Sequence, residues 1–271
     1  MRILIRTSKW AILARRLGGL AVPLVVLPVL MHRERLMDSP SFHIVALVAF
    51  AVAALALLVS LIAIVRLWYT GDQGWGRAIA GLFLVLICLT PFGYYGSLAL
   101  RYPLVTDIAT VQRGDLPLIF DTETAAMPPP YTLMPDEQAL YFPNAASRAY
   151  PIAPADLFAL AERIVLNNGW DIRRRSEPQA DQPGRLNARI VTIPGWREEA
   201  VLRVSSTPQG AAIDMRSASL NAPHDFGSNG NRISAFMVAL DTDVTAFIRD
   251  NPNAPPPEPD DDSPEVETGA E

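Results

Sequence analysis

The chain is poor in the residues that build covalent cross-links, metal sites and acid–base catalysis. Its 271 residues include one cysteine, Cys88, and three histidines. A single cysteine excludes an intrachain disulfide, and because Cys88 lies in an apolar run, it also argues against a cysteine nucleophile in a soluble part. Only His224 lies outside the first hundred residues, and one histidine cannot build a typical zinc site. We therefore predict neither a metal nor a cofactor.

Lysine is nearly absent too, and the charges are unevenly spread. Residues 1–100 carry a net charge of +6, residues 101–250 carry −4 and residues 251–271 carry −7, which together give the overall −5. Three unlike segments are therefore expected. The acidic balance of the second and third segments argues against nucleic acid as a partner.

Long runs without charge dominate the first segment. Residues 17–31, 44–65 and 78–100 are apolar, and the middle run would be about 33 Å long as a helix, enough to cross a bilayer core of roughly 30 Å. A buried helical hairpin of a soluble protein is the alternative interpretation. The first run lacks a small-residue cleavage motif, so we interpret it as an uncleaved span rather than a signal peptide. Residues 1–100 are thus predicted to be a three-span anchor in a lipid bilayer.

Basic residues near the ends of the runs predict the orientation. With the amino terminus inside, seven Arg and Lys residues face the cytoplasm and three face outward. This predicts a multi-pass protein of the bacterial inner membrane with a cytoplasmic amino terminus and a periplasmic carboxy-terminal domain. Gly93 and Gly96, next to Pro91 in the third run, are interpreted as sites of close helix packing.

Three further segments are predicted after residue 100: an arm, a folded domain and a tail. Residues 101–153 are rich in proline and poor in periodic pattern, so they are predicted to form an extended arm, either a tether that wraps the domain or a segment that drapes a ligand. Residues 154–250 show an amphipathic helix, about four strands joined by short turns, and a second helix. This order predicts an α+β fold with an antiparallel sheet. Residues 251–271 are predicted to be a disordered acidic tail.

Residues 214–240 hold the densest group of small polar and ionisable side chains. The block contains Arg216-Ser217-Ala218-Ser219, then Asp225-Phe226-Gly227-Ser228-Asn229, then Arg232-Ile233. Together with Pro103, the Asp107-to-Thr110 element and Tyr150-Pro151, it resembles the domain of unknown function 1499 family over most of residues 103–245. One departure is the stretch 220–224, where many members carry a basic residue. The resemblance implies a domain and no established activity.

The candidate ligand-binding residues come from that block. They are Arg216, Ser217, Ser219, Asp225, Asn229 and Arg232. In a structural interpretation, Asp225 and Asn229 accept hydrogen bonds from free amides at a helix start, Arg232 pairs with Asp225, and Gly227 supplies a left-handed turn. In a functional interpretation, the same amides and Arg232 bind an anionic group.

A second group of charges is expected on one face of the sheet. Simple alternation places Arg189, Arg203 and Arg216 on the same face as Glu199 and Asp214. A ladder of cross-strand ion pairs is the ordinary interpretation, and a face that binds an anionic envelope component is the other.

No catalytic residue is predicted. Ser217 or Ser219 with His224 and Asp225 can be written as a triad, but adjacent residues rarely point at one another productively, and no nucleophile-elbow motif is nearby. We therefore expect an anchored, non-enzymatic module that binds an envelope protein or an anionic envelope ligand. The alternative is a tethered periplasmic hydrolase using the region of Asp225, Arg232 and Ser217, so the sequence leaves enzymatic activity open.

Overall fold

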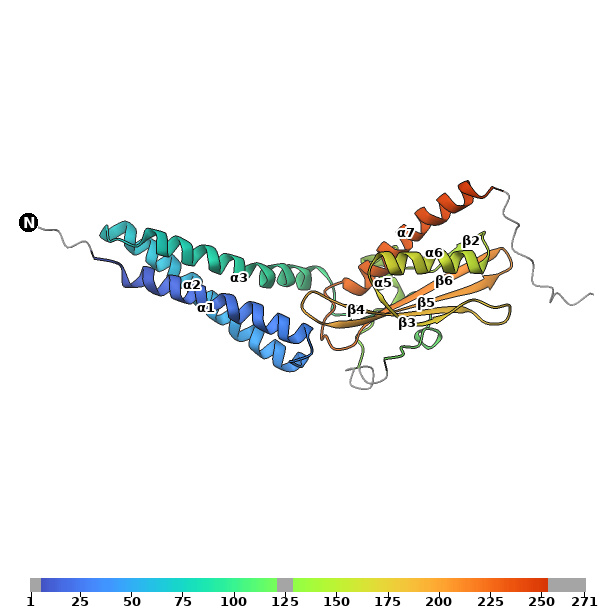
Figure 1. Ribbon diagram of the computed structural model, residues 1–271, viewed down its shortest axis with the longest axis horizontal. Coiled ribbons are helices and arrows are strands. Elements are labelled where there is room, and N and C mark those ends of the chain that lie inside the picture. Colours follow the sequence, from blue (N-terminus) through green and yellow to red (C-terminus); the bar gives the residue numbers. More distant parts are fainter. Residues whose placement is uncertain (1–5, 121–128, 253–271) are drawn as a thin grey trace, which may run out of the picture. The chain divides into compact units, whose positions relative to one another are not determined.

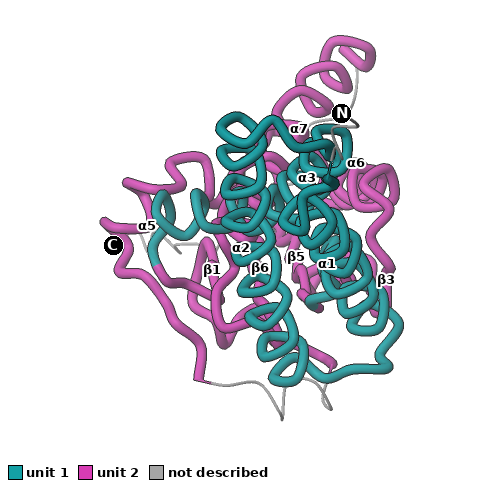
Figure 2. Tube along the Cα trace, turned by 90° about the vertical axis from the view of Figure 1, so that its left-hand side faces the viewer, with its two compact units in different colours: residues 1–103, 191–196 teal, residues 104–190, 197–271 magenta. Residues whose placement is uncertain are grey.

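The chain forms two compact units in a computed structural model (Figure 1), which describes residues 6–120 and 129–252. Unit 1 comprises residues 1–103 with 191–196, and unit 2 comprises residues 104–190 with 197–271 (Figure 2). The predicted acidic tail lies outside the described residues except for Asn251 and Pro252.

Unit 1 contains three long helices: α1 (Lys9–Arg33), α2 (Ser39–Thr70) and α3 (Trp75–Arg101). All three are long and apolar enough to cross a membrane. The prediction of three apolar helices before a folded domain is confirmed. Prolines lie inside α1 and α3, as transmembrane helices tolerate when neighbouring groups satisfy the freed carbonyls.

The three helices pack through small residues. Ala49, Ala53, Ala56 and Ala63 of α2 are fully buried and recur at the three- and four-residue spacing of a single helix face. Their outward neighbours are large and exposed, as in Leu47. Apolar side chains that face outward suit lipid, because lipid offers them the same surroundings as a protein core.

Helices α1 and α3 come closest at two glycines. A Cβ atom on Gly81 would lie 2.7 Å from the carbonyl oxygen of Ala14, and one on Gly18 would lie 2.8 Å from that of Gly81. The prediction that Gly93 and Gly96 serve this purpose is wrong, because a Cβ atom on either would meet nothing within 4 Å. Both lie on an open face of α3, and the close approach occurs nearer its amino-terminal end.

Unit 2 is built on an antiparallel sheet. Its long strands are β4 (Gly184–Val191), β5 (Arg197–Thr207) and β6 (Gly210–Ser219), and β3 (Asp171–Ser176) forms one edge. At the other edge, β1 (Asp107–Ala109) and β2 (Arg148–Tyr150) pair with opposite ends of β6. The sheet thus has six strands rather than the four expected. The two additional strands come from the proline-rich arm and contain three residues each, too few to show an alternating pattern.

Helices α6 (Pro154–Asn167) and α7 (Ser228–Asp250) cover one face of this sheet (Figure 1). The apolar residues that recur at helical spacing in both helices are buried: Leu157, Leu160, Ala161, Ile164 and Val165 in α6, and Ile233, Phe236, Met237, Leu240 and Val244 in α7. They pack over inward-facing residues of β5 and β6 such as Leu202, Ile213 and Met215. Periodicity predicted these helices correctly because their apolar side chains occupy one face only.

The opposite face of the sheet is covered by the first part of the arm. This part includes the short 3-10 helix η1 (Arg113–Asp115), and Leu116 and Phe120 are buried. Further along, α5 (Pro135–Tyr141) is followed by buried Phe142, which packs against Gly230 in α7. These contacts agree with the interpretation of the arm as a wrapping tether.

Candidate functional site

The polar block ends β6 and begins α7. Phe226 and Gly227 both have positive φ, 55° and 79°, and they reverse the chain before the helix. Asp225 accepts hydrogen bonds from the backbone amides of Gly227 (2.8 Å) and Asn229 (3.2 Å). The capping role of Asp225 and the left-handed turn at Gly227 are therefore as the structural interpretation predicted.

The side chain of Asn229 makes long-range hydrogen bonds and does not cap the helix. This side chain is fully buried, its Oδ1 accepts hydrogen bonds from Ser217 Oγ (2.7 Å) and Arg232 Nη1 (3.1 Å), and its Nδ2 donates to the carbonyl of Thr106 and to Ser219 Oγ. It therefore joins α7 to β6 and to the arm. The prediction that Asn229 accepts from free amides at the helix start is wrong, because its oxygen is already used by two side-chain donors.

Arg232 pairs with Glu198 of β5 and not with Asp225. Its other terminal nitrogen donates to Ser217 Oγ at 2.6 Å. Glu198 also accepts hydrogen bonds from Ser219 Oγ (3.1 Å) and Ser228 Oγ (2.7 Å). The expected ion pair between Arg232 and Asp225 is therefore absent. Arg232 pairs with Glu198 instead, and Asp225 accepts hydrogen bonds from backbone amides.

Glu198 is the functional candidate that sequence reasoning missed. It lies directly opposite Ser219 in the pairing of β5 with β6, and its side chain is 2% exposed. A buried glutamate in a strand is unusual unless it has partners. The signal that could have found Glu198 is the pairing register of β5 with β6, because that register places Glu198 opposite Ser219.

The side chain of Arg216 lies on the opposite face of the sheet from the other five candidate residues. Arg216 alternates with Ser217 along β6, so its side chain lies on the face that the arm covers. There it donates to both carboxylate oxygens of Asp107 (3.1 and 2.8 Å) and to the carbonyl of Leu116. The structure therefore brings together Ser217, Ser219, Asp225, Asn229 and Arg232, and places Arg216 in a second buried ion pair.

The charged face of the sheet contains one of the expected cross-strand pairs. Arg203 donates to Asp214 at 2.7 and 3.0 Å, and Ser147 donates to the same carboxylate. Glu199 instead accepts from the backbone amide of Ile119 and from Asn187 Nδ2. Burial raises the pKa of Glu199, and the Asn187 hydrogen bond is the largest of the effects that oppose it.

His224 does not face a serine. Its Nδ1 accepts a hydrogen bond from the amide of Phe226 at 3.0 Å, and its ring stacks on Phe226. The hydroxyls of Ser217 and Ser219 donate to Asn229 and Glu198 instead. Within residues 6–120 and 129–252, no three His, Cys, Asp or Glu side chains are grouped to hold a metal ion.

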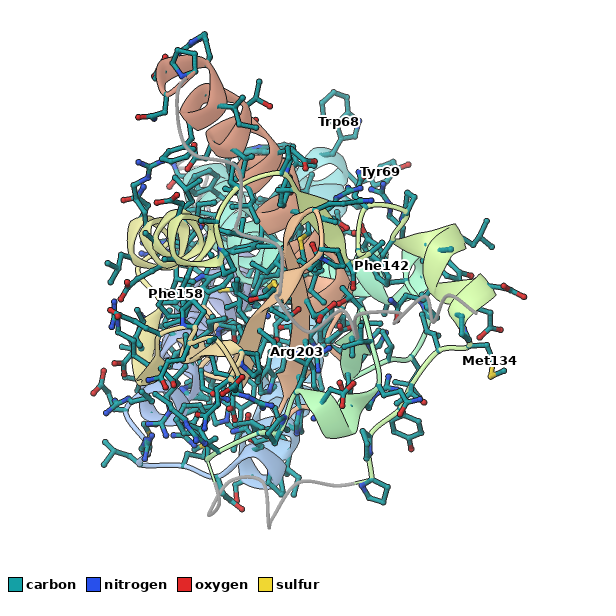
Figure 3. All side chains as sticks on the ribbon, turned by 90° about the vertical axis from the view of Figure 1, so that its right-hand side faces the viewer. Trp68, Tyr69, Met134, Phe142, Phe158 and Arg203 are labelled. Atoms are coloured by element: carbon teal, nitrogen blue, oxygen red, sulfur yellow. The ribbon has the colours of Figure 1, made fainter. Side chains whose placement is uncertain are left out.

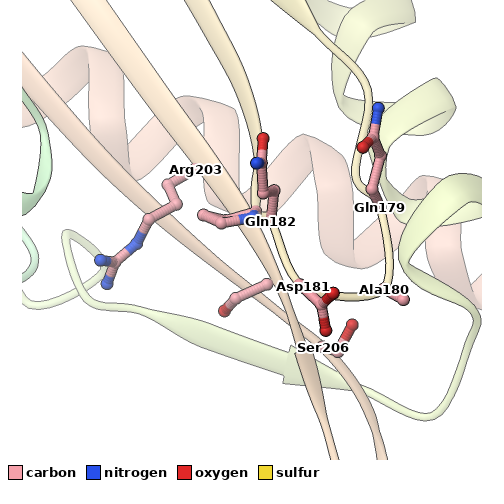
Figure 4. Close-up of a pocket in the computed structure, with 8 residues that line it drawn as sticks. Gln179, Ala180, Asp181, Gln182, Arg203 and Ser206 are labelled. Carbon is pink, nitrogen blue, oxygen red and sulfur yellow. The ribbon is translucent and has the colours of Figure 1, made fainter.

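A concave site lies elsewhere on unit 2 (Figure 4). Its volume is about 360 Å³, and it lies between the loop after β3 and the end of β5. The loop contributes Gln179, Asp181 and Gln182, and β5 contributes Arg203 and Ser206. The guanidinium of Arg203 points away from the loop glutamines, toward its carboxylate partners, and Ala180 and Pro183 add apolar surface to the polar lining.

The chain is thus a set of membrane-type helices joined to an α+β domain with a buried polar network. The model of the family described as "Protein of unknown function (DUF1499)" matches residues 123–240. The resemblance seen in the sequence is confirmed over this segment. The match begins after the element at residues 107–110, and it ends within α7. No curated protein matches the chain.

Proposed function

We propose that the chain is a membrane-anchored module whose α+β domain lies on the outer side of the bacterial inner membrane and binds a component of the envelope. The three apolar helices support an anchor, and the distribution of Arg and Lys around them supports an outward-facing domain. The family match brings a domain without an activity. Placement in the periplasm is part of this proposal.

The cavity beside Arg203 is the observation that carries the binding function. Its volume falls within the range of small-ligand sites, about 300–1,000 Å³. The amides of Gln179 and Gln182 and the hydroxyl of Ser206 line it. Such groups hydrogen-bond to hydroxyl and amide groups of a ligand.

An anionic ligand, the class expected from the sequence, fits this cavity less well. Arg203 is held between Asp214 (2.7 Å) and Asp115 (3.5 Å), and Asp181 adds another negative charge. The two carboxylates offset the positive charge of Arg203, so little attraction remains for an anion in the cavity. We therefore propose a neutral ligand rich in hydroxyl or amide groups.

At the start of α7 the same reasoning applies to Arg232. An anion bound there must compete with Glu198, which is buried and directly paired with it. Anion binding by Ser217, Ser219, Asp225, Asn229 and Arg232 stays a prediction. What supports a structural role for them is that each already has a partner within unit 2.

The hydrolase alternative has less support. Ser217 is fully buried and its hydroxyl donates to Asn229, so it faces no general base. His224 uses Nδ1 within its own loop. We therefore put binding ahead of hydrolysis.

Site-specific cross-linking in cells tests the binding proposal. A photoreactive amino acid replaces Ser206 in the cavity, and the matched control carries it at Gln209 in the exposed turn after β5. We expect an adduct at 206 that mass spectrometry assigns to a hydroxyl- or amide-rich envelope component, and none at 209. Equal adducts at both positions, or none at 206, would contradict the proposal.

A further inference from the structure

Exposed apolar side chains gather in the part of unit 2 that follows the anchor. Met134 is 69% exposed and Leu140 is 77% exposed, at the start and near the end of α5. Leu104, Tyr131 and Tyr141 are also about half exposed. We call these five residues the entry patch. Single exposed apolar residues are ordinary, but several large ones on one short element call for an explanation.

Two contacts attach α5, which carries most of the entry patch, to the rest of unit 2. Gln138 of α5 donates to the carbonyl of Ala109 in β1 at 3.1 Å, and buried Phe142 fixes the end of α5 against Gly230 in α7. Figure 3 shows Met134 at the margin of the molecule and Phe142 further inside. Helix α5 itself buries none of its residues, so Met134, Leu140 and Tyr141 stay exposed while Gln138 and the following Phe142 attach the helix to the rest of unit 2.

Chain connectivity limits how far this patch can lie from the end of α3. Helix α3 ends at Arg101, and Leu104 follows three residues later, at most about 11 Å along an extended chain. Thr106, five residues after Arg101, exchanges hydrogen bonds with Tyr131 at 2.9 and 3.0 Å. The distance between the patch and the end of α3 is thus limited by covalent geometry, whatever the orientation of the domain.

The composition of the patch suits the interfacial region of a bilayer. Tyrosine is enriched at membrane–water interfaces, where its ring is buried and its hydroxyl is hydrated. Leucine and methionine add apolar surface, as in helices that lie in the interface plane. Glu137, in the first turn of α5, accepts a hydrogen bond from the Met134 amide, so its charge is partly used within the chain.

We propose that the entry patch inserts into the lipid leaflet at the carboxy-terminal end of α3 and holds the α+β domain against the membrane surface. The inference depends on α3 spanning the bilayer and is independent of any ligand at the Arg203 cavity. Because the patch has no basic residue, its binding depends on apolar contact and not on anionic lipid headgroups.

Spin labels on the full chain in phosphatidylcholine nanodiscs test this proposal. Cys88→Ser, or Cys88→Ala should the first variant fail to insert, removes the native thiol. Labels are then placed by Leu140→Cys or Met134→Cys. The control is Gln209→Cys, an exposed position at the far end of β6 from its pairing with β1, about 30 Å away at strand spacing.

Collisions with oxygen, which concentrates in lipid, are compared with collisions with a water-soluble nickel chelate. We expect the ratio of oxygen to nickel accessibility to be several-fold higher at 134 and 140 than at 209, and unchanged when phosphatidylglycerol is added. Equal ratios at all three positions would overturn the proposal. So would protection of 134 and 140 from both reagents, since that would indicate a covering protein.

Discussion

The two units differ in the size of the residues that pack in their interiors. Unit 1 brings helices together through glycine and alanine, so that backbones meet at Gly18 and Gly81. Unit 2 packs large apolar side chains between helices and a sheet, and it also buries charged groups such as Glu198. Lipid is as apolar as a helix surface, so membrane helices gain most from close contact. In unit 2, Glu198, Asp107 and Asp214 pair with arginines, while Glu199 and Asp225 accept hydrogen bonds from amides.

The comparison teaches where each unit is vulnerable. In unit 1, adding volume is harmful because no space remains between α1 and α3. In unit 2, removing a polar partner is harmful because the remaining group stays buried without compensation. The predictions below separate these two modes of failure, in order of decreasing effect.

The largest effect is expected from Arg232→Met. It leaves the carboxylate of Glu198 buried with only serine donors, and we expect a loss of about 3–5 kcal/mol in the free energy of unfolding of unit 2. Hydrogen–deuterium exchange of the β6 amides in the full chain measures it. The control, Arg249→Met, removes an arginine that is 75% exposed and should change little.

The double variant Glu198→Leu with Arg232→Met sharpens that test. Most of the lost stability should return, because neither charge then remains buried. Unchanged stability in Arg232→Met together with loss of a cellular phenotype would contradict a structural role and would favour the anion-binding or hydrolase hypothesis for this junction.

Gly81→Val should act on unit 1. Its Cβ atom would lie 2.7 Å from the Ala14 backbone, and we expect about 1–3 kcal/mol of destabilisation from overpacking. Gly93→Val, in the same helix but with open space around it, is the matched control. Loss of helical circular dichroism on titration with denaturing detergent measures both. Equal effects in the two variants would argue against close packing at Gly81.

Asp225→Ala should cost less, on the order of 1 kcal/mol, because it removes a cap from the first turn of α7. Exchange of the amides of Gly227 and Asn229 should accelerate locally. Asp243→Ala, which lies in α7 and breaks only an exposed pair with Arg163 of α6, should leave those amides protected. Similar exchange in both variants would show that Asp225 is not the cap.

The smallest effect concerns pH. Burial raises the pKa of Glu199 above its ordinary value, so the folded chain binds a proton before the unfolded chain does. The contribution of Glu199 to stability should therefore rise as the pH falls through the folded-state pKa, and level off below the ordinary value of 4.5. The difference in unfolding free energy between the parent chain and Glu199→Gln, followed between pH 7 and 4.5, measures it. An opposite slope would show that the Asn187 and Ile119 hydrogen bonds outweigh burial.

Much of the fold followed from local patterns. Uncharged runs longer than a bilayer core predicted the spans, and one-sided apolar periodicity predicted α6 and α7. The antiparallel sheet between these two helices was predicted as well, from short turns that join its strands. The two strands of the arm were not, because three residues such as Arg148–Tyr150 carry too little pattern and are ordered by pairing with β6.

The candidate site was predicted less completely. Asp225, Asn229 and Arg232 were expected around a helix start and lie there, and the capping role of Asp225 follows from its position relative to the turn. The partner of Arg232 did not follow, since Glu198 lies 34 residues away in the chain. Arg216 was grouped with Ser217 by proximity in sequence, although neighbouring residues of a strand point to opposite faces.

Local patterns along the chain were therefore enough to predict the apolar helices, the order of the two helices and the long strands, and the turn at Gly227, because each depends on interactions within a few residues. Long-range packing sets which glycines bring α1 and α3 together, which carboxylate pairs with Arg232 and on which face of the sheet Arg216 is buried. These depend on strand register and helix rotation, where a shift of one residue changes every partner.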